Sequence, residues 1–239
     1  NIKSFLVSAS DIPRLLPERR PDAHKGQFGH LGVVAGSPAM PGAAQLVLRA
    51  ALRSGVGLVS WATDKETAAF APLRPPEVML AFGNGEPYAV LEKATAIVMG
   101  PGFGLDPERR ELLTGYLTHI RCPACLDADA LHLLALDPEL WAHVRPQTVL
   151  TPHPKEMGRL LQCSAQEVNR DRLGMARRLA HERQCVVVLK GASTVVASPT
   201  GEAVVIAAGN PGMAKGGSGD VLAGLLGGLL AQGLAPFAA

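Results

Sequence analysis

Short, continuously apolar runs alternate along this chain with longer segments in which apolar residues recur every three or four positions. Runs of the first kind are typical of parallel strands covered by helices on both faces, and segments of the second kind are typical of helices. The runs predict strands at residues 31–36, 56–63, 96–100, 124–129, 148–152 and 185–191. The longer segments predict helices at residues 42–53, 107–119 and 165–182.

This alternation of strands and helices indicates right-handed βαβ units and therefore an α/β fold with a mostly parallel central sheet. Two β-branched runs, TVVAS and AVVIAA, flank the turn formed by Pro199, Thr200, Gly201 and Glu202. That pattern predicts an antiparallel hairpin at one edge of the sheet. No linker or low-complexity segment divides the chain. We therefore expect residues 1–239 to form a single domain.

Composition narrows the class of protein. The chain has 239 residues, of which 47% are hydrophobic and 18% charged, which favours a large buried core. A net charge of +2 gives no support for nucleic-acid binding, and no apolar run reaches the roughly 18 residues of a membrane span. The N-terminal segment lacks the pattern of a signal peptide. Its first residue is Asn rather than Met, which fits a processed product or a piece of a longer protein.

The spacing of the four cysteines gives little support for metal or redox chemistry. Cys122 and Cys125 form a C-x-x-C pair, but the pair leads into a predicted strand instead of opening a helix. Cys163 and Cys185 stand alone, and His119 adds only a third candidate ligand to the pair. We therefore interpret the cysteines as structural, in a reduced, cytoplasmic protein.

The most informative segment is GNPGMAKGGSGDVLAGL, where a glycine-rich loop delivers Asp220 to the start of an apolar helix. Backbone N–H groups in such a loop can hold phosphate oxygens, helped by the positive end of the helix dipole. A carboxylate beside a phosphate is unfavourable unless it has a task, such as accepting the proton of an attacking hydroxyl. Taken alone, the loop is equally compatible with Asp220 as a helix cap.

Other predicted strands also end in glycine-rich or polar segments: GSPAMPGAAQ, GPGFG, TPHPKE and KGAST. In open α/β sheets the carboxyl ends of the strands form the ligand site, so these segments together predict the rim of one pocket. Standard motifs are missing. There is no P-loop, Leu105 replaces the third glycine of a dinucleotide fingerprint, and neither a zinc-protease nor a nucleophile-elbow motif occurs.

These segments, with HKGQFGHLGVVAGS, PGAAQLVLRAALRSGVGLV and DADAL, resemble the ADP/ATP-dependent NAD(P)H-hydrate dehydratases over residues 24–233. The resemblance implies a ribokinase-like three-layer αβα sandwich. It also implies repair of the S epimer of NADH or NADPH hydrate: the hydrate hydroxyl is phosphorylated by ADP or ATP with Mg2+, and phosphate is then eliminated. NADH or NADPH hydrate and an adenine nucleotide would be the binding partners, with no nucleic acid and no membrane.

Site residues follow from the same resemblance. It implies that Asp220 is the catalytic base and that Ala43, Gly102 and His153 line the hydrate pocket with it. The expected nucleotide-binding residues are Lys190, Gly191, Ala192, Ser193, Thr194, Gly216, Gly217, Ser218 and Gly219. Glu156 is the candidate metal ligand, or else orients His153. Asn210, Asp127 and Lys25 are further candidates, although Lys25 has an alternative role in anchoring the first strand.

The chain departs from the family pattern at three places. Lys215 stands where Thr is usual, Lys155 replaces a Gly, and the chain stops at Ala239, where the family continues with another helix. We therefore expect the domain to lack its C-terminal end. The resemblance further implies a homo-oligomer, with a tetramer favoured, and fusion to or cooperation with an NAD(P)H-hydrate epimerase. Two alternatives stay open: a kinase for a small alcohol such as a vitamin precursor, and a non-catalytic nucleotide-binding module.

Overall fold

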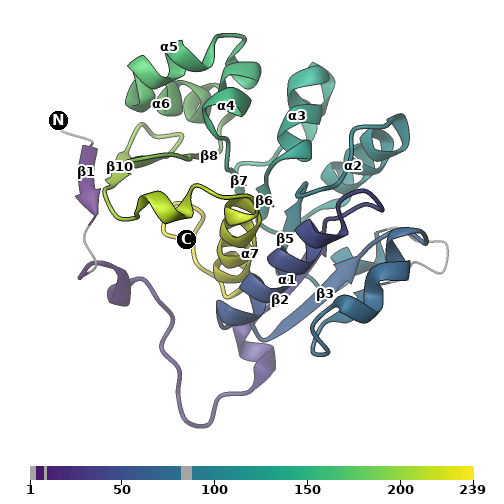
Figure 1. Cartoon of the computed structure of the whole chain (residues 1–239). Coiled ribbons are helices and arrows are strands. Elements are labelled where there is room, and N and C mark those ends of the chain that lie inside the picture. Colours follow the sequence, from purple (N-terminus) through teal and green to yellow (C-terminus); the bar gives the residue numbers. More distant parts are fainter. Residues whose placement is uncertain (1–3, 8–9, 82–87) are drawn as a thin grey trace.

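The computed structural model describes residues 4–7, 10–81 and 88–239, so the predicted domain of residues 1–239 also includes positions outside these ranges. Ten strands in the described part form one sheet, in the order β1-β10-β9-β8-β7-β6-β5-β2-β3-β4 (Figure 1). The strands are β1 (Ser4–Val7), β2 (His30–Val34), β3 (Leu58–Ala62), β4 (Met79–Ala81), β5 (Ala96–Met99), β6 (Ala124–Leu126), β7 (Thr148–Leu150), β8 (Val186–Leu189), β9 (Thr194–Ala197) and β10 (Ala203–Ile206).

The predicted mostly parallel sheet with an antiparallel hairpin is confirmed. Strands β2 to β8 pair in parallel, and β9 runs antiparallel to both β8 and β10. β1 lies beyond the hairpin, parallel to β10. The predicted strand at 124–129 is too long, because β6 ends at Leu126 and Asp129 already begins a helix.

Helices cover both faces of the sheet (Figure 1). They are α1 (Pro41–Arg53), α2 (Pro107–His119), α3 (Asp129–Leu136), α4 (Pro154–Leu161), α5 (Ala165–Arg170), α6 (Arg172–Arg183) and α7 (Ser218–Ala231). The prediction of a single helix at 165–182 is wrong, because the backbone leaves the helical conformation at Asp171 (φ −139°, ψ 68°). The Asp171 side chain accepts a hydrogen bond from the Gly174 N–H at 2.8 Å, so it caps a new helix.

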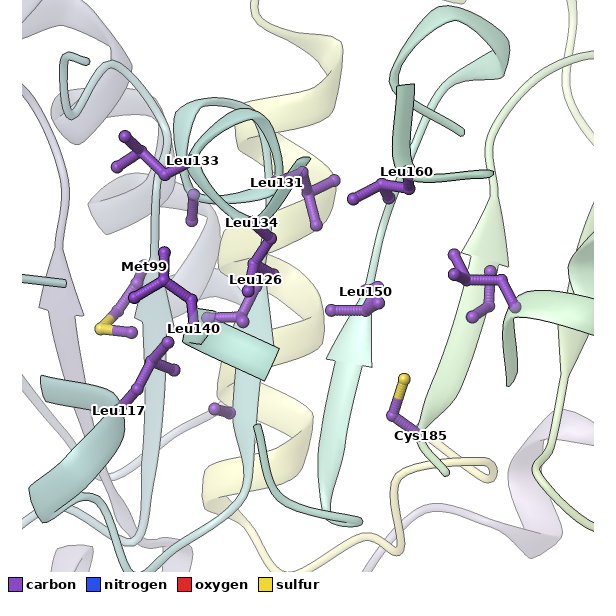
Figure 2. Packing of buried hydrophobic residues seen from close by; sticks show 14 of the residues in the cluster. Met99, Leu117, Leu126, Leu131, Leu133, Leu134, Leu140, Leu150, Leu160 and Cys185 are labelled. Atoms are coloured by element: carbon purple, nitrogen blue, oxygen red, sulfur yellow. The ribbon is translucent and has the colours of Figure 1, made fainter. Parts of the chain in front are cut away.

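The core consists of two apolar layers, one on each side of the sheet. Side chains alternate along each strand: Val98 packs in the layer with α1 and α7, whereas Ile97 and Met99 pack in the layer with α2 and α3. Figure 2 shows the second layer, where Leu126 of β6 and Leu150 of β7 lie beneath the helical leucines. Because both faces are covered, the central strands are apolar throughout.

Glycines allow α7 to lie close to its neighbours. A Cβ at Gly227 would overlap the Val98 side chain, and one at Gly224 would overlap the Val47 carbonyl oxygen in α1. Each glycine costs the helix about 1 kcal/mol of intrinsic stability relative to Ala, which the close packing must offset. The start of α7, with Asp220, is thereby held against α1 at the carboxyl ends of the central strands.

Lys25 lies at the amino ends of the central strands, away from the carboxyl ends where Asp220 lies. It begins the 3-10 turn η2 (Lys25–Phe28), just before the amino end of β2, and its carbonyl lies against Gly57 at the amino end of β3. The structure therefore favours its alternative role at the entry to the first central strand over a phosphate contact. Across the described residues, no helix combines the length and apolarity needed to cross a bilayer.

Candidate active site

An ion pair joins the carboxyl ends of β6 and β8. The Lys190 ammonium, at the end of β8, donates to Asp127 Oδ1 at 2.6 Å. Asp127 directly follows β6, and its side chain is only 2% exposed. A second carboxylate, Glu156 Oε2, lies 3.8 Å from the same ammonium. Residues that follow three neighbouring strands, β6, β7 and β8, therefore meet at the carboxyl edge of the sheet, where open α/β sheets bind ligands.

The glycine loop lies against this ion pair. A Cβ built on Gly219 would lie 3.4 Å from Lys190 Nζ and 3.6 Å from Asp127 Oδ2. Gly217 is the N-cap of α7, with φ +86°, and a Cβ there would lie 2.5 Å from Leu46 Cδ1 of α1. The Ser218 hydroxyl donates to the Met213 carbonyl at 2.7 Å and fixes the entry to the loop. Gly216 has no atom within 4 Å of a built Cβ, so the loop is open on that side.

Asp220 lies in the first turn of α7 rather than at its N-cap, which Gly217 occupies. The helix-cap interpretation therefore does not account for this carboxylate. The pKa of Asp220 is raised above its ordinary value, mainly because partial burial penalises the charged form and because Asp127 and Asp129 face it. Lys190 acts in the opposite direction. A half-buried carboxylate with increased proton affinity is suited to accept a proton.

The 190–194 segment turns sharply after β8. Gly191 has φ +144° and Ser193 has φ +57°, and the Thr194 hydroxyl donates to the Gly191 carbonyl at 3.0 Å. Arg172 of α6 donates from Nη2 to the carbonyls of Leu189 and Lys190, at 3.0 and 3.1 Å. Ala192 and Ser193 are exposed at the tip. The guanidinium thus fixes the base of a segment whose tip is accessible to a ligand.

His153 and Glu156 form a reciprocal capping box at the start of α4. His153 Nδ1 accepts from the N–H groups of Lys155 and Glu156 at 3.1 and 3.2 Å, while the His153 N–H donates to Glu156 Oε2 at 2.7 Å. Burial, followed by Lys190, lowers the pKa of His153. Since Nδ1 is an acceptor, the neutral ring carries its proton on Nε2. Lys155 is helical and exposed, so it does not disturb this turn.

The pKa of Glu156 is raised, mainly by burial, with Lys190 and the His153 N–H opposing that effect. Among residues 4–7, 10–81 and 88–239, no group of three or more His, Cys, Asp and Glu side chains could hold a metal ion. Mg2+ in nucleotide sites commonly uses one or two carboxylates together with phosphate oxygens and water. Glu156 could supply one such carboxylate, and its Oε2 already accepts a hydrogen bond from the His153 N–H.

The two small residues expected in the hydrate pocket are brought together. Gly102 has φ +61°, and a Cβ there would lie 2.7 Å from the Ala43 Cβ and 3.0 Å from the Met40 Cβ. Ala43 is one turn before Leu46, which touches the glycine loop, so both lie on the same face of α1. This close approach accounts for small side chains by packing alone, and it also places them beside the loop.

The turn after β6 lies between the Lys190 ion pair and the GPGFG loop that contains Gly102. Ala128 has φ +48° and ψ −115°, a conformation that a residue with a Cβ rarely adopts. On one side of it, Asp127 binds Lys190. On the other side, Asp129 Oδ2 accepts from the Gly104 N–H at 2.9 Å and so holds the GPGFG loop. The strained turn therefore directs two neighbouring carboxylates to different loops of the site.

The sequence undervalued three residues that the structure brings to the site. Asp127 was only a further candidate, and Asp129 and Arg172 were not singled out. A signal for Asp127 existed, since it is the first polar residue after an apolar central strand. In contrast, Asn210 caps a local turn by accepting from the Gly212 N–H at 2.9 Å, and Lys215 is an exposed residue of the loop.

Two hollows in the described part of the chain are lined by other residues than those that converge on Lys190. A hollow of about 660 Å³ lies between α4 and α5, beside Gly158, Cys163 and Ser164. A smaller cavity of about 130 Å³ lies between α2 and the sheet, beside Gly36 and Phe103. Neither is lined by Asp220 or Lys190. We therefore assign the site from its converging side chains and not from a cavity.

Sequence comparison matches residues 31–239 to the family described as NAD(P)H-hydrate dehydratase. The chain is 38% identical over 97% of its length to the bifunctional NAD(P)H-hydrate repair enzyme of Moorella thermoacetica, but covers only 46% of that enzyme. It is 40% identical to the ADP-dependent (S)-NAD(P)H-hydrate dehydratase of Neisseria meningitidis, covering 99% of this chain and 81% of that one. The chain thus spans about half the length of its bifunctional relatives.

Solved structures confirm the predicted ribokinase-like fold. A ribokinase-like superfamily protein from Enterococcus faecalis superposes with a TM-score of 0.85 at 28% identity, over 96% of this chain and 81% of that one. The ADP/ATP-dependent NAD(P)H-hydrate dehydratase of Bacillus subtilis, co-crystallised with ATP and Mg2+, gives 0.84 at 32% identity, over 98% and 84%. With Asp220, Lys190 and the glycine loop gathered at the expected edge, the chain belongs to the NAD(P)H-hydrate dehydratase family.

Proposed function

We propose that this chain dehydrates the S epimer of NADH hydrate or NADPH hydrate to the usable cofactor, with ADP or ATP as phosphoryl donor. The observation that carries the proposal is the position of Asp220. Its carboxylate stands at the start of α7, beside the Lys190–Asp127 pair and the open glycine loop, in a chain of the dehydratase family. Relatives from Neisseria and Bacillus bear the names of ADP-dependent and ADP/ATP-dependent dehydratases.

Phosphorylation solves the chemical difficulty of this reaction, because hydroxide is a poor leaving group. Asp220 accepts the proton of the hydrate hydroxyl as that oxygen forms a bond to the terminal phosphorus of the nucleotide. The anhydride P–O bond breaks, and AMP or ADP leaves. The C–O bond of the phosphorylated hydrate then breaks with loss of phosphate, and a proton leaves the neighbouring carbon. The nicotinamide double bond is thereby restored.

Phosphoryl transfer demands positioning and charge neutralisation more than covalent chemistry. Lys190 supplies a partly exposed positive charge, and the positive end of α7 lies at the glycine loop of residues 216–219. The 190–194 segment holds the adenine nucleotide. Neutral His153 donates from Nε2 to the hydrate, and Ala43 and Gly102 allow the nicotinamide ring to approach the backbone.

Mg2+ bound with the nucleotide would neutralise phosphate charge, and Glu156 is the residue that would hold it, directly or through a bound water. Two features support that role. Glu156 lies within 4 Å of the ammonium that faces the phosphate site, and one of its carboxylate oxygens is fixed by the His153 N–H. Nucleotide binding measured with and without Mg2+, in wild type and in Glu156→Gln, tests this assignment.

The experiment that tests the proposed function is an absorbance assay. Purified chain is incubated with NADH hydrate and either ADP or ATP, and the near-ultraviolet absorbance of reduced nicotinamide is followed together with phosphate release. We expect recovery of absorbance with stoichiometric phosphate, loss of turnover in Asp220→Asn, and retained nucleotide binding in that variant. Absence of recovery with both nucleotides contradicts the proposal, and a stable phosphorylated alcohol in its place would identify a small-molecule kinase.

The wider setting is also a proposal. The Moorella and E. coli relatives are bifunctional repair enzymes about twice as long, which supports cooperation with an epimerase, on the same chain or as a separate protein. Exposed apolar side chains near the N-terminus, Phe5, Leu6, Ile12, Leu15 and Leu16, support a homo-oligomer such as a tetramer, which light scattering would test. All four cysteines are free thiols, as in a cytoplasmic protein.

A further inference from the structure

Lys190 lies among three carboxylates, and its choice of partner matters for the chemistry. Asp127 Oδ1 is 2.6 Å from the ammonium and Glu156 Oε2 is 3.8 Å away. Asp220 is the third, one residue after Gly219, where a built Cβ would lie 3.4 Å from the ammonium. Consecutive Cα atoms are about 3.8 Å apart, so a flexible lysine side chain can reach either Asp127 or Asp220.

The structure shows which partner is chosen. Within the described part of the chain, Lys190 forms ion pairs with Asp127 and Glu156 but not with Asp220. Asp127 is a fixed partner, because its N–H donates to the Met99 carbonyl at 3.1 Å and its own carbonyl accepts from the Ala130 N–H at 3.1 Å. The strained backbone of Ala128 follows immediately. The turn thus holds the Asp127 carboxylate in a fixed position beside the Lys190 ammonium.

We infer that Asp127 is a positioning residue that holds Lys190 away from Asp220, so that Asp220 stays available as a base while the ammonium faces the phosphate site. The inference deepens the proposed function, since it depends on Asp220 acting as the base. Asp127 itself need not touch a reactant. Its role is to bind Lys190, which would otherwise pair with Asp220 and move away from the phosphate site.

Asp127→Asn is the informative change, because Asn keeps the shape of the side chain and removes its charge. Lys190 then keeps Glu156 at 3.8 Å and has Asp220 as a second carboxylate within reach. An opposite charge at about 4–6 Å lowers the pKa of an aspartate by roughly 1–3 units. The variant is therefore expected to have a weaker base and a lysine withdrawn from the phosphate.

The first test is a carboxyl-carbon NMR titration of Asp220 in the nucleotide-free chain, which needs no turnover. Asp127 and Asp129, from the turn after β6, and Lys190, from β8, are the charged groups that face Asp220. We expect Asp127→Asn to lower the Asp220 pKa by about one unit or more. Removing a negative neighbour lowers it by itself, so the same change is made in a Lys190→Met background, where only that direct effect persists. Equal shifts in both backgrounds overturn the inference.

The second test is ADP affinity by calorimetry. We expect Asp127→Asn to weaken ADP binding about tenfold in the wild-type background. In Asp220→Asn the lysine can no longer be drawn to Asp220, so the same substitution should leave the affinity unchanged or increase it. An equal loss in both backgrounds indicates a purely structural role and contradicts the inference. Asp137→Asn, which breaks the remote pair with Arg110, is the matched control and should change neither measurement.

The two proposals fail in distinguishable ways. If ADP does not bind the wild-type chain, the proposed function loses its donor, whereas the Asp220 titration still decides whether Asp127 restrains Lys190. Asp127→Ser, which is smaller and neutral, serves as a second variant if Asp127→Asn does not fold. In an active enzyme, the acid limb of kcat/KM should move to lower pH in Asp127→Asn, which a simple loss of stability would not produce.

Discussion

Lys190→Met should destabilise the chain strongly, because it leaves a carboxylate buried without its partner. Methionine has a similar length and a flexible apolar stem, so the packing of the side chain is largely kept. The change removes the ammonium that lies 2.6 Å from Asp127 Oδ1, and the Asp127 side chain is only 2% exposed. Water therefore cannot replace the lost partner.

The expected cost is about 3–5 kcal/mol, the range for removing one member of a buried ion pair. The reverse change is milder. Asp127→Asn leaves Lys190, whose side chain is 19% exposed and still has Glu156 at 3.8 Å. We expect at most about half the cost in that case, since the remaining charge is partly solvated and partly paired. The asymmetry follows directly from the difference in exposure.

Urea unfolding at neutral pH measures both changes, with the double variant Asp127→Asn/Lys190→Met beside them. Removing both charges should recover most of the stability lost in Lys190→Met, because no unpaired charge is left inside. Arg178→Met is the matched control: it breaks an ion pair to Glu182 in which both side chains are about half exposed, at 51% and 43%, so it should hardly change the stability.

Two outcomes would refute this reasoning. If Lys190→Met stays within about 1 kcal/mol of wild type, the pair is effectively solvated and does not organise the site. If the double variant is as unstable as Lys190→Met, the loss comes from packing of the lysine stem and not from the stranded carboxylate.

Two further predictions concern stability. Gly100→Ala should lower the free energy of unfolding by about 3 kcal/mol or more, because φ is +117° and the new Cβ would overlap the Asp127 carbonyl oxygen. Gly201→Ala is the control in the same urea assay: φ is +87° but no atom lies within 4 Å of the new Cβ, so only the backbone strain of about 1 kcal/mol should appear. Asp220→Asn should stabilise the chain increasingly as pH rises: the folded pKa of Asp220 lies above its ordinary value of 3.8, so the wild type loses stability as pH rises through that pKa while the Asn variant does not. Unfolding measured from below pH 3.8, the ordinary pKa of the group, up to neutral pH tests this sign, and a difference independent of pH would contradict it.

Much of the fold could be predicted from sequence, because the central strands are buried on both faces and appear as continuous apolar runs. β1 and β4 were missed for a physical reason: they are edge strands of four and three residues, and pairing with β10 and β3 defines them more than their own pattern does. The break between α5 and α6 was missed although Asp171 has the signature of an N-cap. There the local hydrogen bond to Gly174 wins over helical periodicity.

The site was less predictable than the fold. The glycine loop and the strand-end segments could be found because each is a short glycine-rich or polar stretch next to an apolar one. The Asp127–Lys190 pair joins residues 63 positions apart, and only the order of strands in the sheet brings them together. Likewise, the sequence does not show that Asp129 holds Gly104 or that Arg172 supports the end of β8. Such contacts are properties of the topology rather than of any segment.

The surroundings of Asp220 favour a chemical over a structural explanation. A carboxylate in the first turn of a helix is normally stabilised in its charged form by the helix dipole, which lowers its pKa. Here the pKa is raised instead, mainly by burial and then by the facing carboxylates Asp127 and Asp129, with Lys190 opposing the effect. Near it, Ala128 adopts a conformation that costs about 1–3 kcal/mol. A chain selected for stability alone would relieve both costs with one neutral residue and one glycine, so their presence together supports the proposal that Asp220 acts as a base while Lys190 is held by Asp127.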